Sequence, residues 1–175
     1  IVPPSLEQPI MNLPFEEGQT WFFTGGPHGG WDSGSAWAAL DFAPPGDNGS
    51  CLASSLWVVA VADGLVLRAS NGALIQDLDN DGYEQTGWTI LYMHIAADGR
   101  VDPGEYVYAG ERIGHPSCEG GVSNATHVHL ARKYNGEWIP ADGALPFVLS
   151  GWIPHNGLAA YQGTLTKGGL TVIAC

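Results

Sequence analysis

Short apolar segments separated by glycine-containing dipeptides recur along the whole chain, and this punctuation restricts the fold more than any other feature. The 175 residues include 25 glycines and 12 prolines. Asn-Gly, Asp-Gly and Gly-Gly pairs form tight turns between strands, whereas long helices need uninterrupted helix-forming residues. The sequence therefore predicts a mainly β fold: a single domain with a core antiparallel β-sheet, long loops and little helix.

The expected strands are the apolar or alternating segments between these turns. They are residues 38–43, 56–61, 64–70, 74–78, 88–94, 106–108, 112–114, 127–134, 137–139, 164–167 and 170–174. Asp63-Gly64 is expected to join 56–61 to 64–70 in a hairpin, and Gly168-Gly169 to close a terminal hairpin. Within one domain, 1–175, we expect an irregular Pro-rich arm over 1–20 and a C-terminal extension over 141–175, with a helical turn near 145–149.

The charge balance excludes several classes of partner. The chain has a formal net charge of −12 and only six Lys and Arg residues. Nucleic acids and anionic membrane surfaces attract basic proteins, so neither is an expected partner. No run of about 18 apolar residues is present, so no membrane-spanning segment is expected. The start at Ile1 without Met and the low lysine content indicate a processed, secreted protein.

Two histidines share one face of an expected strand. In N-A-T-H-V-H-L-A-R-K-Y, side chains alternate with period two, so His127 and His129 point the same way. Val128 and Leu130 then face the core. Neighbouring imidazoles on a packed strand indicate a metal site or a reaction, although a His-x-His pair also arises by chance.

Two more residues are candidate metal ligands. His28 lies in T-G-G-P-H-G-G-W-D-S-G, a Gly-rich segment whose backbone freedom suits the presentation of a ligand. Asp41 lies in the apolar segment W-A-A-L-D-F-A-P, and residues 1–67 contain no Lys or Arg to pair with it. A buried carboxylate without such a partner favours a bound cation, although Asp41 could instead cap a turn before the prolines.

The remaining histidines differ in their surroundings. His94 ends the segment G-W-T-I-L-Y-M-H, and strict alternation places Tyr92 beside it near the end of a strand, where functional sites are common. His115 and His155 are interpreted as ordinary hydrogen-bonded residues.

These segments together resemble the zinc endopeptidases of the β-lytic and lysostaphin type, and the β-lytic and staphylolytic branch more closely. The resemblance is carried, in order, by H-G-G-W-D-S-G-S-A-W-A-A-L-D, L-Y-M-H-I and C-E-G-G-V-S-N-A-T-H-V-H-L-A, and it spans about residues 20–140. It implies that His28, Asp41 and His129 bind one catalytic zinc and that His94 and His127 form the catalytic pair.

The chain departs from the family pattern at two places without losing any of these residues. Thr126 stands where many members have Pro, and Ala39-Leu40 precedes Asp41 where lysostaphin-type members have Gly-Thr. The resemblance further implies a secreted enzyme, made with a propeptide, that hydrolyses peptide cross-links of bacterial peptidoglycan, often at Gly-Gly bonds. The expected partner is therefore a peptide or peptidoglycan substrate, and we expect the protein to be a monomer.

The resemblance implies a mechanism of zinc-activated water with histidine acid–base help. Zinc held by three protein ligands keeps a position for water and lowers its pKa to about 7. No H-E-x-x-H glutamate is present, so an imidazole is the expected base, and the sequence leaves open whether this is His127 or His94. His94, with Tyr92, is expected to orient the water or to donate to the oxyanion.

Three alternatives remain open from the sequence. A zinc peptidase of the D-alanyl-D-alanine type would need a shorter His-to-Asp spacing and a glutamate near the last histidine. A non-catalytic zinc-binding module would be expected to lack a ligand, and here all positions are filled. A carbohydrate-binding β domain at the cell wall could use the seven tryptophans as stacking platforms. The charge of −12 is itself unexpected for an enzyme acting on polyanionic walls.

Two structural features are also expected. D-L-D-N-D-G-Y-E resembles the opening of a calcium loop, so Asp77, Asp79 and Asp81 are candidate ligands for a structural calcium, with a solvated acidic turn as the alternative. If Asp41 and His129 approach one zinc from neighbouring antiparallel strands, then Cys51 and Cys118 fall at the same end of these strands. We therefore predict a Cys51–Cys118 disulfide, with Cys175 left free or paired elsewhere.

Overall fold

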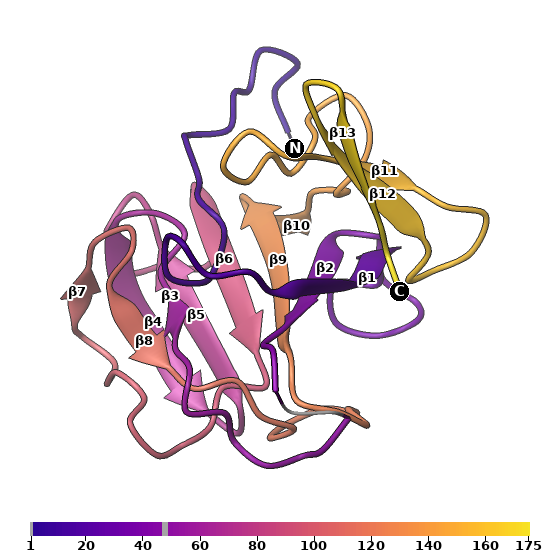
Figure 1. Cartoon of the computed structure of the whole chain (residues 1–175). Coiled ribbons are helices and arrows are strands. Elements are labelled where there is room, and N and C mark those ends of the chain that lie inside the picture. The colour runs from indigo at the N-terminus through magenta and orange to yellow at the C-terminus, as the bar shows by residue number, and fades with distance from the viewer. Residues whose placement is uncertain (1, 47–48) are drawn as a thin grey trace.

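A large antiparallel sheet forms the centre of the computed structural model, which describes residues 2–46 and 49–175 (Figure 1). Ile1, on which the expectation of a processed start rested, lies outside these residues. The strands are β1 Phe22–His28, β2 Ala39–Ala43, β3 Val58–Val59, β4 Gly64–Ser70, β5 Ala73–Asp77, β6 Trp88–Met93, β7 Tyr106–Val107, β8 Arg112–Gly114, β9 Val128–Tyr134, β10 Glu137–Trp138, β11 Ile153–Asn156, β12 Gly163–Lys167 and β13 Leu170–Ile173.

Three sheets account for these strands, and every pairing is antiparallel. The main sheet has the order β1-β2-β9-β6-β5-β4-β7, with β10 paired to β9, while β11-β12-β13 and β3-β8 form two smaller sheets. The described part of the chain contains no helix. The predicted mainly β, antiparallel architecture is confirmed, and the helical turn expected near 145–149 is wrong.

Turn chemistry explains which hairpins form. Asn71 and Gly72 have φ values of 50° and 77°, and these two residues join β4 to β5. A two-residue turn with positive φ at both positions matches the twist of the strands that it joins. The hairpin expected between 56–61 and 64–70 is therefore wrong: β4 pairs with β5, and β3 pairs with β8 instead.

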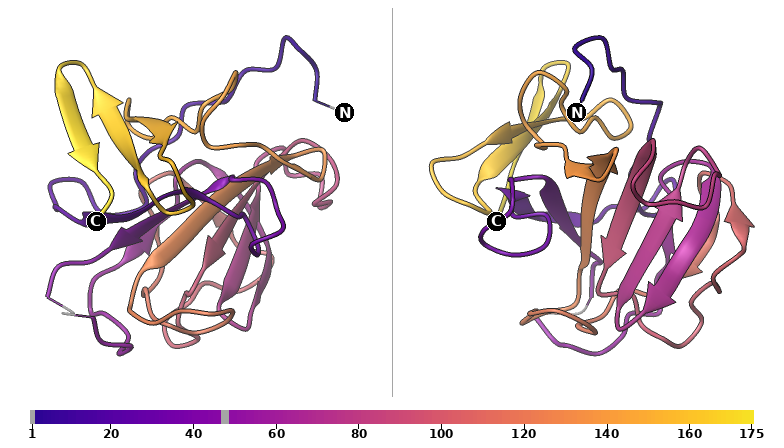
Figure 2. Two further views of the ribbon diagram at one scale, coloured as in Figure 1. Left: turned by 90° about the vertical axis from the view of Figure 1, so that its right-hand side faces the viewer. Right: turned by 180° about the vertical axis from the view of Figure 1, so that it is seen from behind.

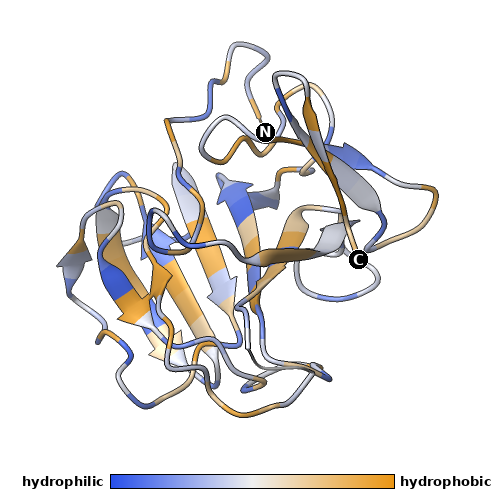
Figure 3. Cartoon of the chain, viewed as in Figure 1, coloured by the Kyte–Doolittle hydropathy of each residue, from blue (hydrophilic) through white to orange (hydrophobic). Residues whose placement is uncertain are grey.

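The core lies on one face of the main sheet. Alternate residues of β2, β9 and β6 point into it, among them Leu40, Leu130 and Ile90, which are each 0% exposed. The small β3–β8 sheet and the N-terminal arm cover this face, contributing Val58 and Ile113 from the strands and further apolar side chains from the arm. Figure 3 shows the apolar residues along the strands of the main sheet and β8. The opposite face of the main sheet carries the side chains that alternate with these core residues, among them Asp41 and His129.

The N-terminal arm and the C-terminal extension are tied to the sheet. Asn12 N of the arm donates one backbone hydrogen bond to Val61 O, and Met11 O accepts one from Ser150 N. The fully buried guanidinium of Arg132 on β9 donates to Gln8 of the arm and to the backbone oxygen of Leu145.

The C-terminal extension contains the predicted hairpin, β12–β13, and an additional strand, β11. Figures 1 and 2 show this small sheet at the β1 end of the main sheet, far from β7, and β11 and β12 contact β1. None of the described residues forms a helix long and apolar enough to cross a membrane.

Candidate metal centre

Neighbouring strands bring Asp41 and His129 together on the face opposite the core. Asp41 of β2 pairs directly with His129 of β9, and β1 on the other side of β2 ends at His28. The three side chains are buried, with exposed fractions of 6% for Asp41, 9% for His129 and 2% for His28. Gly25 of β1 lies opposite Asp41, and a Cβ there would come 2.5 Å from Asp41 Oδ2, so glycine makes room for the carboxylate.

The atoms of these side chains converge closely. Asp41 Oδ1 lies 3.3 Å from His28 Nε2 and 3.2 Å from His129 Nδ1. The two histidine nitrogens are 3.1 Å apart. The other nitrogen of each ring is close to a backbone carbonyl: His28 Nδ1 is 2.7 Å from Gly26 O, and His129 Nε2 is 2.7 Å from Gly30 O.

These carbonyls decide which nitrogens carry protons. Since a carbonyl oxygen only accepts, His28 Nδ1 and His129 Nε2 donate, and the neutral rings turn their lone pairs toward Asp41 Oδ1. Asp41 Oδ1 is itself buried without a hydrogen-bond partner. Burial acts to raise the pKa of Asp41, whereas protons on the facing nitrogens of His129 and His28 would hold that pKa well below its usual value through hydrogen bonds and charge.

Three acceptor atoms that face one another without a donor need a cation between them. Ligand atoms of tetrahedral zinc, at about 2.0–2.1 Å from the metal, lie about 3.3 Å from one another. The observed separations of 3.1–3.3 Å match this value. Nitrogen and oxygen donors with second-shell carbonyls on the imidazoles are typical of zinc sites. The residues present therefore fit zinc.

His127 and His94 stand beside this cluster with a common orientation. His127 Nδ1 donates to Ala125 O at 2.8 Å, and His127 Nε2 lies 3.7 Å from Asp41 Oδ2. His94 Nδ1 lies 3.0 Å from the carbonyl oxygens of Glu119 and Gly120, and its ring centroid is 4.5 Å from that of His127. With Nδ1 of each ring at a carbonyl oxygen, Nε2 carries the lone pair and can accept a hydrogen bond or a proton.

His94 is electrically neutral at neutral pH. Burial and the neighbouring His127 lower the pKa of His94 to about 4. A neutral imidazole can accept a proton, which is the property required of a general base.

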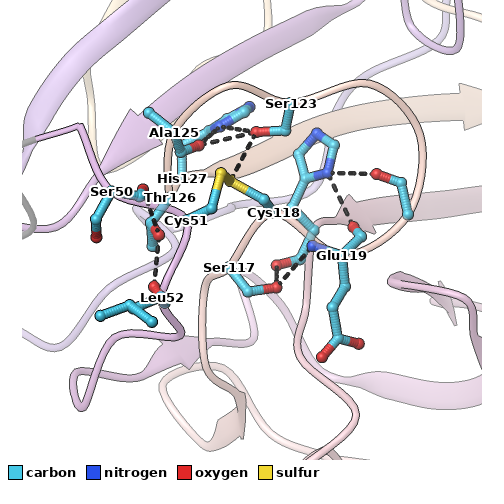
Figure 4. The surroundings of a disulfide bond; sticks show 12 residues. Ser50, Cys51, Leu52, Ser117, Cys118, Glu119, Ser123, Ala125, Thr126 and His127 are labelled. Atoms are coloured by element: carbon cyan, nitrogen blue, oxygen red, sulfur yellow. Dashed lines mark hydrogen bonds between the residues drawn. A yellow bond between two sulfur atoms is a disulfide. The ribbon is translucent and has the colours of Figure 1, made fainter.

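The predicted disulfide lies in the segment that supplies the hydrogen-bond partners of His94 and His127. Cys51 and Cys118 are bonded, which confirms the predicted pairing, and Cys175 is free and exposed. Figure 4 shows the bridge beside Glu119, whose carbonyl accepts from His94, and beside Ser123. Ser123 Oγ lies 3.3 Å from His127 Nδ1, so the disulfide joins the supports of the two histidines.

Tyr92 requires a correction, because the structure separates it from the histidines. Its hydroxyl is fully buried in the core, where it accepts from Val61 N at 2.9 Å and donates to Gln76 Oε1 at 2.7 Å. Burial raises the pKa of Tyr92. Alternation fails at this point because His94 has φ of 70°, which turns its side chain to the face of Met93 rather than that of Tyr92.

A second tyrosine, not predicted from the sequence, lies at the site instead. The ring of Tyr161 stacks on that of His28, with centroids 4.0 Å apart and planes at 23°. Burial and the charge of Asp41 raise its pKa. Tyr161 comes from the loop between β11 and β12, which hydrogen-bonds to β1 through Gly26 N and Tyr161 O at 2.7 Å. No local motif surrounds it in the sequence, so only the long-range pairing reveals it.

The cluster opens into a cleft of ≈ 890 Å³. Its walls include the four histidines and Asp41, together with Trp31 and Tyr161. The structure thus brings together every predicted site residue except Tyr92 and the acidic loop.

The acidic loop shows no support for calcium. Asp77, Asp79 and Asp81 lie close together, but they accept hydrogen bonds from within the loop. Asp77 Oδ2 accepts from Gly82 N at 3.0 Å and Asp81 Oδ1 from Tyr83 N at 2.8 Å. These bonds form the solvated acidic turn that was the alternative.

Comparison with known proteins extends the resemblance drawn from the motifs. No family model matches the chain. Protease LasA of Pseudomonas aeruginosa is 26% identical over 155 residues, covering 82% of this chain and 33% of LasA. The chain thus spans about a third of the length of the curated relatives that it matches.

Superposition on solved structures identifies the fold. The M23 metalloprotease pseudoalterin, described as from the deep sea, superposes with a TM-score of 0.73 at 24% identity, over 97% of this chain and 96% of that one. The chain has the M23 metalloprotease fold. A zinc-containing peptidase of Vibrio cholerae superposes with a TM-score of 0.55 at 18% identity, over 79% of this chain and 41% of that one. The predicted resemblance to the staphylolytic, M23-type peptidases is confirmed by sequence and fold together.

Proposed function

We propose that this chain is a zinc metalloendopeptidase. The observation that carries the proposal is the convergence of His28 Nε2, Asp41 Oδ1 and His129 Nδ1, three acceptor atoms within 3.3 Å of one another and without a donor, at the edge of a cleft. Relatives named as proteases support the same activity. When bound, zinc supplies a Lewis acid that polarises a carbonyl and lowers the pKa of water.

The chain's own residues provide the proton transfers. His127 and His94 both direct Nε2 into the cleft, and both are fixed by carbonyl oxygens at Nδ1. Either ring can accept the proton of an attacking water and then donate it to the leaving amine. Tyr161, which stacks on His28 and lines the cleft, takes the place of Tyr92 as the candidate donor to the oxyanion.

The proposed substrates are peptide bonds in Gly-rich cross-links of bacterial peptidoglycan, and the proposed location is extracellular. The names and the fold of the M23-type relatives support a peptidase of this kind. The Cys51–Cys118 disulfide supports an oxidising compartment, because such bonds persist outside the cytosol. We propose that the protein acts as a monomer.

The proposal is tested by measuring metal content and cleavage on one preparation. We expect about one zinc per chain, loss of turnover with a chelator and its return with added zinc. Mass spectrometry of digested cell walls and of glycyl peptides then identifies the bond that is cut. A correctly folded, zinc-loaded protein that cleaves neither substrate would contradict the proposal and favour a non-catalytic zinc-binding or carbohydrate-binding domain.

A further inference from the structure

The face of the main sheet that carries the metal centre continues beyond it. Counting by two along β9 from His129 leads to Ala131 and then to Lys133, all on one face. Their partners on β6 are Met93, Leu91 and Thr89, in the same order. A row of small and apolar residues therefore runs from the histidines to Lys133.

The end of this row nearer Lys133 lies in a groove that adjoins the cleft, while Ala131 in the middle of the row is fully buried and packs with Trp138. The groove has a volume of ≈ 600 Å³, and its floor includes Leu91, Ile75 and Thr89. Trp31 and Asp32 line both the groove and the cleft of the metal centre. The two hollows therefore adjoin at Trp31 and Asp32, and a chain bound at the metal centre would reach the groove past these two residues.

Charge is distributed unevenly in this groove. Although the chain has a net charge of −12 and only six Lys and Arg, Arg68 and Lys133 both line the groove. Arg68 is paired with Glu84 through hydrogen bonds of 3.0 Å and 2.8 Å. The carboxylate of Asp32 accepts from Gly34 N at 2.9 Å within its own turn.

Lys133 is the cation that the groove leaves available. Its ammonium lies 4.3 Å from the ring centroid of Trp138, a cation–π contact that fixes its position. No ion pair joins it to a carboxylate within residues 2–46 and 49–175. The Lys ammonium has three N–H donors, and a ring face cannot accept hydrogen bonds from all of them. The remaining donors are open to an acceptor in the groove.

We propose that the groove binds an acidic side chain of the peptide substrate, with Lys133 as the specificity-determining residue. This inference rests on the proposed peptidase function and adds a preference within the substrate. Four residues of strand separate His129 from Lys133, which is about 13 Å. An extended peptide spans that distance in about four residues, so the carboxylate lies about four residues from the bond that is cut.

The test compares Glu with Gln in otherwise identical peptides. A fluorescent Gly-rich peptide carries one Glu, or one Gln, at each successive position on both sides of a Gly-Gly bond. Dissociation constants are measured by anisotropy with the zinc-depleted protein, so that binding is read without turnover. Hydrolysis by the zinc-loaded protein is measured separately.

We expect the Glu peptide to bind about two- to fivefold more tightly than the Gln peptide at one position about four residues from the bond, which is typical of a partly exposed ion pair. The ratio should shrink as salt is added. Lys133→Gln should reduce it to one, while Lys133→Arg should keep it. Lys167→Gln is the matched control, because it removes the same charge from β12, outside the groove.

A ratio of one at every position in the unmodified protein would overturn the inference, and so would a ratio that survives in Lys133→Gln. Failure of the proposed function has a different signature, since the zinc-loaded protein would then hydrolyse none of the peptides. The two failures are therefore distinguished by separate measurements on the same protein and the same peptides.

Discussion

Replacement of His127 by Ala separates binding of the metal from catalysis. His127 Nε2 lies 3.7 Å from Asp41 Oδ2, and the ring makes none of the contacts among His28, Asp41 and His129. His127→Ala therefore leaves all three ligand atoms and their carbonyl partners in place. The change removes a proton acceptor from the cleft, and it should leave the zinc bound.

The expected loss is in turnover. General acid–base help is worth about 10²–10⁴-fold in rate, or about 2.7–5.5 kcal/mol of activation free energy. Because His94 Nε2 also faces the cleft, it could take over part of the proton transfer, and the loss should lie toward the lower end of this range. His129→Ala, by contrast, removes a ligand and should release the zinc together with the activity.

The assay measures zinc content and peptide turnover on the same preparations of His127→Ala, His94→Ala and His129→Ala. His115→Ala is the control, because the ring of His115 packs at a tilt against Trp57 and its Nδ1 hydrogen-bonds Leu56 O, and His115 does not line the cleft. Protein with His127→Ala that is correctly folded but free of zinc would refute the ligand set. Protein that keeps both zinc and full turnover would refute the catalytic assignment and leave the metal centre standing.

Three further predictions concern the surroundings of the site. Replacing Cys51 and Cys118 by Ser should leave zinc bound but lower turnover and the melting temperature, because closing this long loop with a disulfide stabilises the folded state by about 4 kcal/mol. Metal analysis, a peptide assay and calorimetry measure the three quantities. Gly25→Ala should weaken zinc affinity in a chelator competition by displacing Asp41, and an unchanged affinity would contradict this. Tyr92→Phe should lower the free energy of unfolding by about 1–3 kcal/mol through an unpaired buried amide, with turnover retained.

The convergence of Asp41 and His129, two of the proposed ligands, was predictable because the strands that carry them follow simple alternation. Leu40 and Phe42 pack into the core, which fixes Asp41 on the other face, and Val128 and Leu130 do the same for His129. Direct pairing of β2 with β9 then brings the two side chains together. A one-residue slip would have moved either side chain to the core, so burial of the apolar neighbours specifies the site.

Two errors have local backbone causes. His94 with φ of 70° breaks the alternation that placed Tyr92 beside it, and a positive φ at a residue other than glycine carries no clear signal in one sequence. The hairpin expected at Asp63-Gly64 does not form, because Asn71-Gly72 supplies the two-residue turn. The pairing of β3 with β8, and the approach of Tyr161 to His28, join segments far apart in the chain, which no local pattern indicates.

All four histidines of the site are held in the same way, and this arrangement suits its chemistry. His28 donates to Gly26 O, His129 to Gly30 O, His127 to Ala125 O and His94 to the carbonyls after Cys118. Each carbonyl fixes a tautomer and a ring orientation without adding a negative charge. A carboxylate in that position would favour the imidazolium form and raise the pKa of the ring. The carbonyls thus leave the second nitrogen of His28 and of His129 facing Asp41, which is the anion at the centre of the cluster. Because any residue supplies a carbonyl, the sequence can reveal the histidines but not the groups that assign their protons.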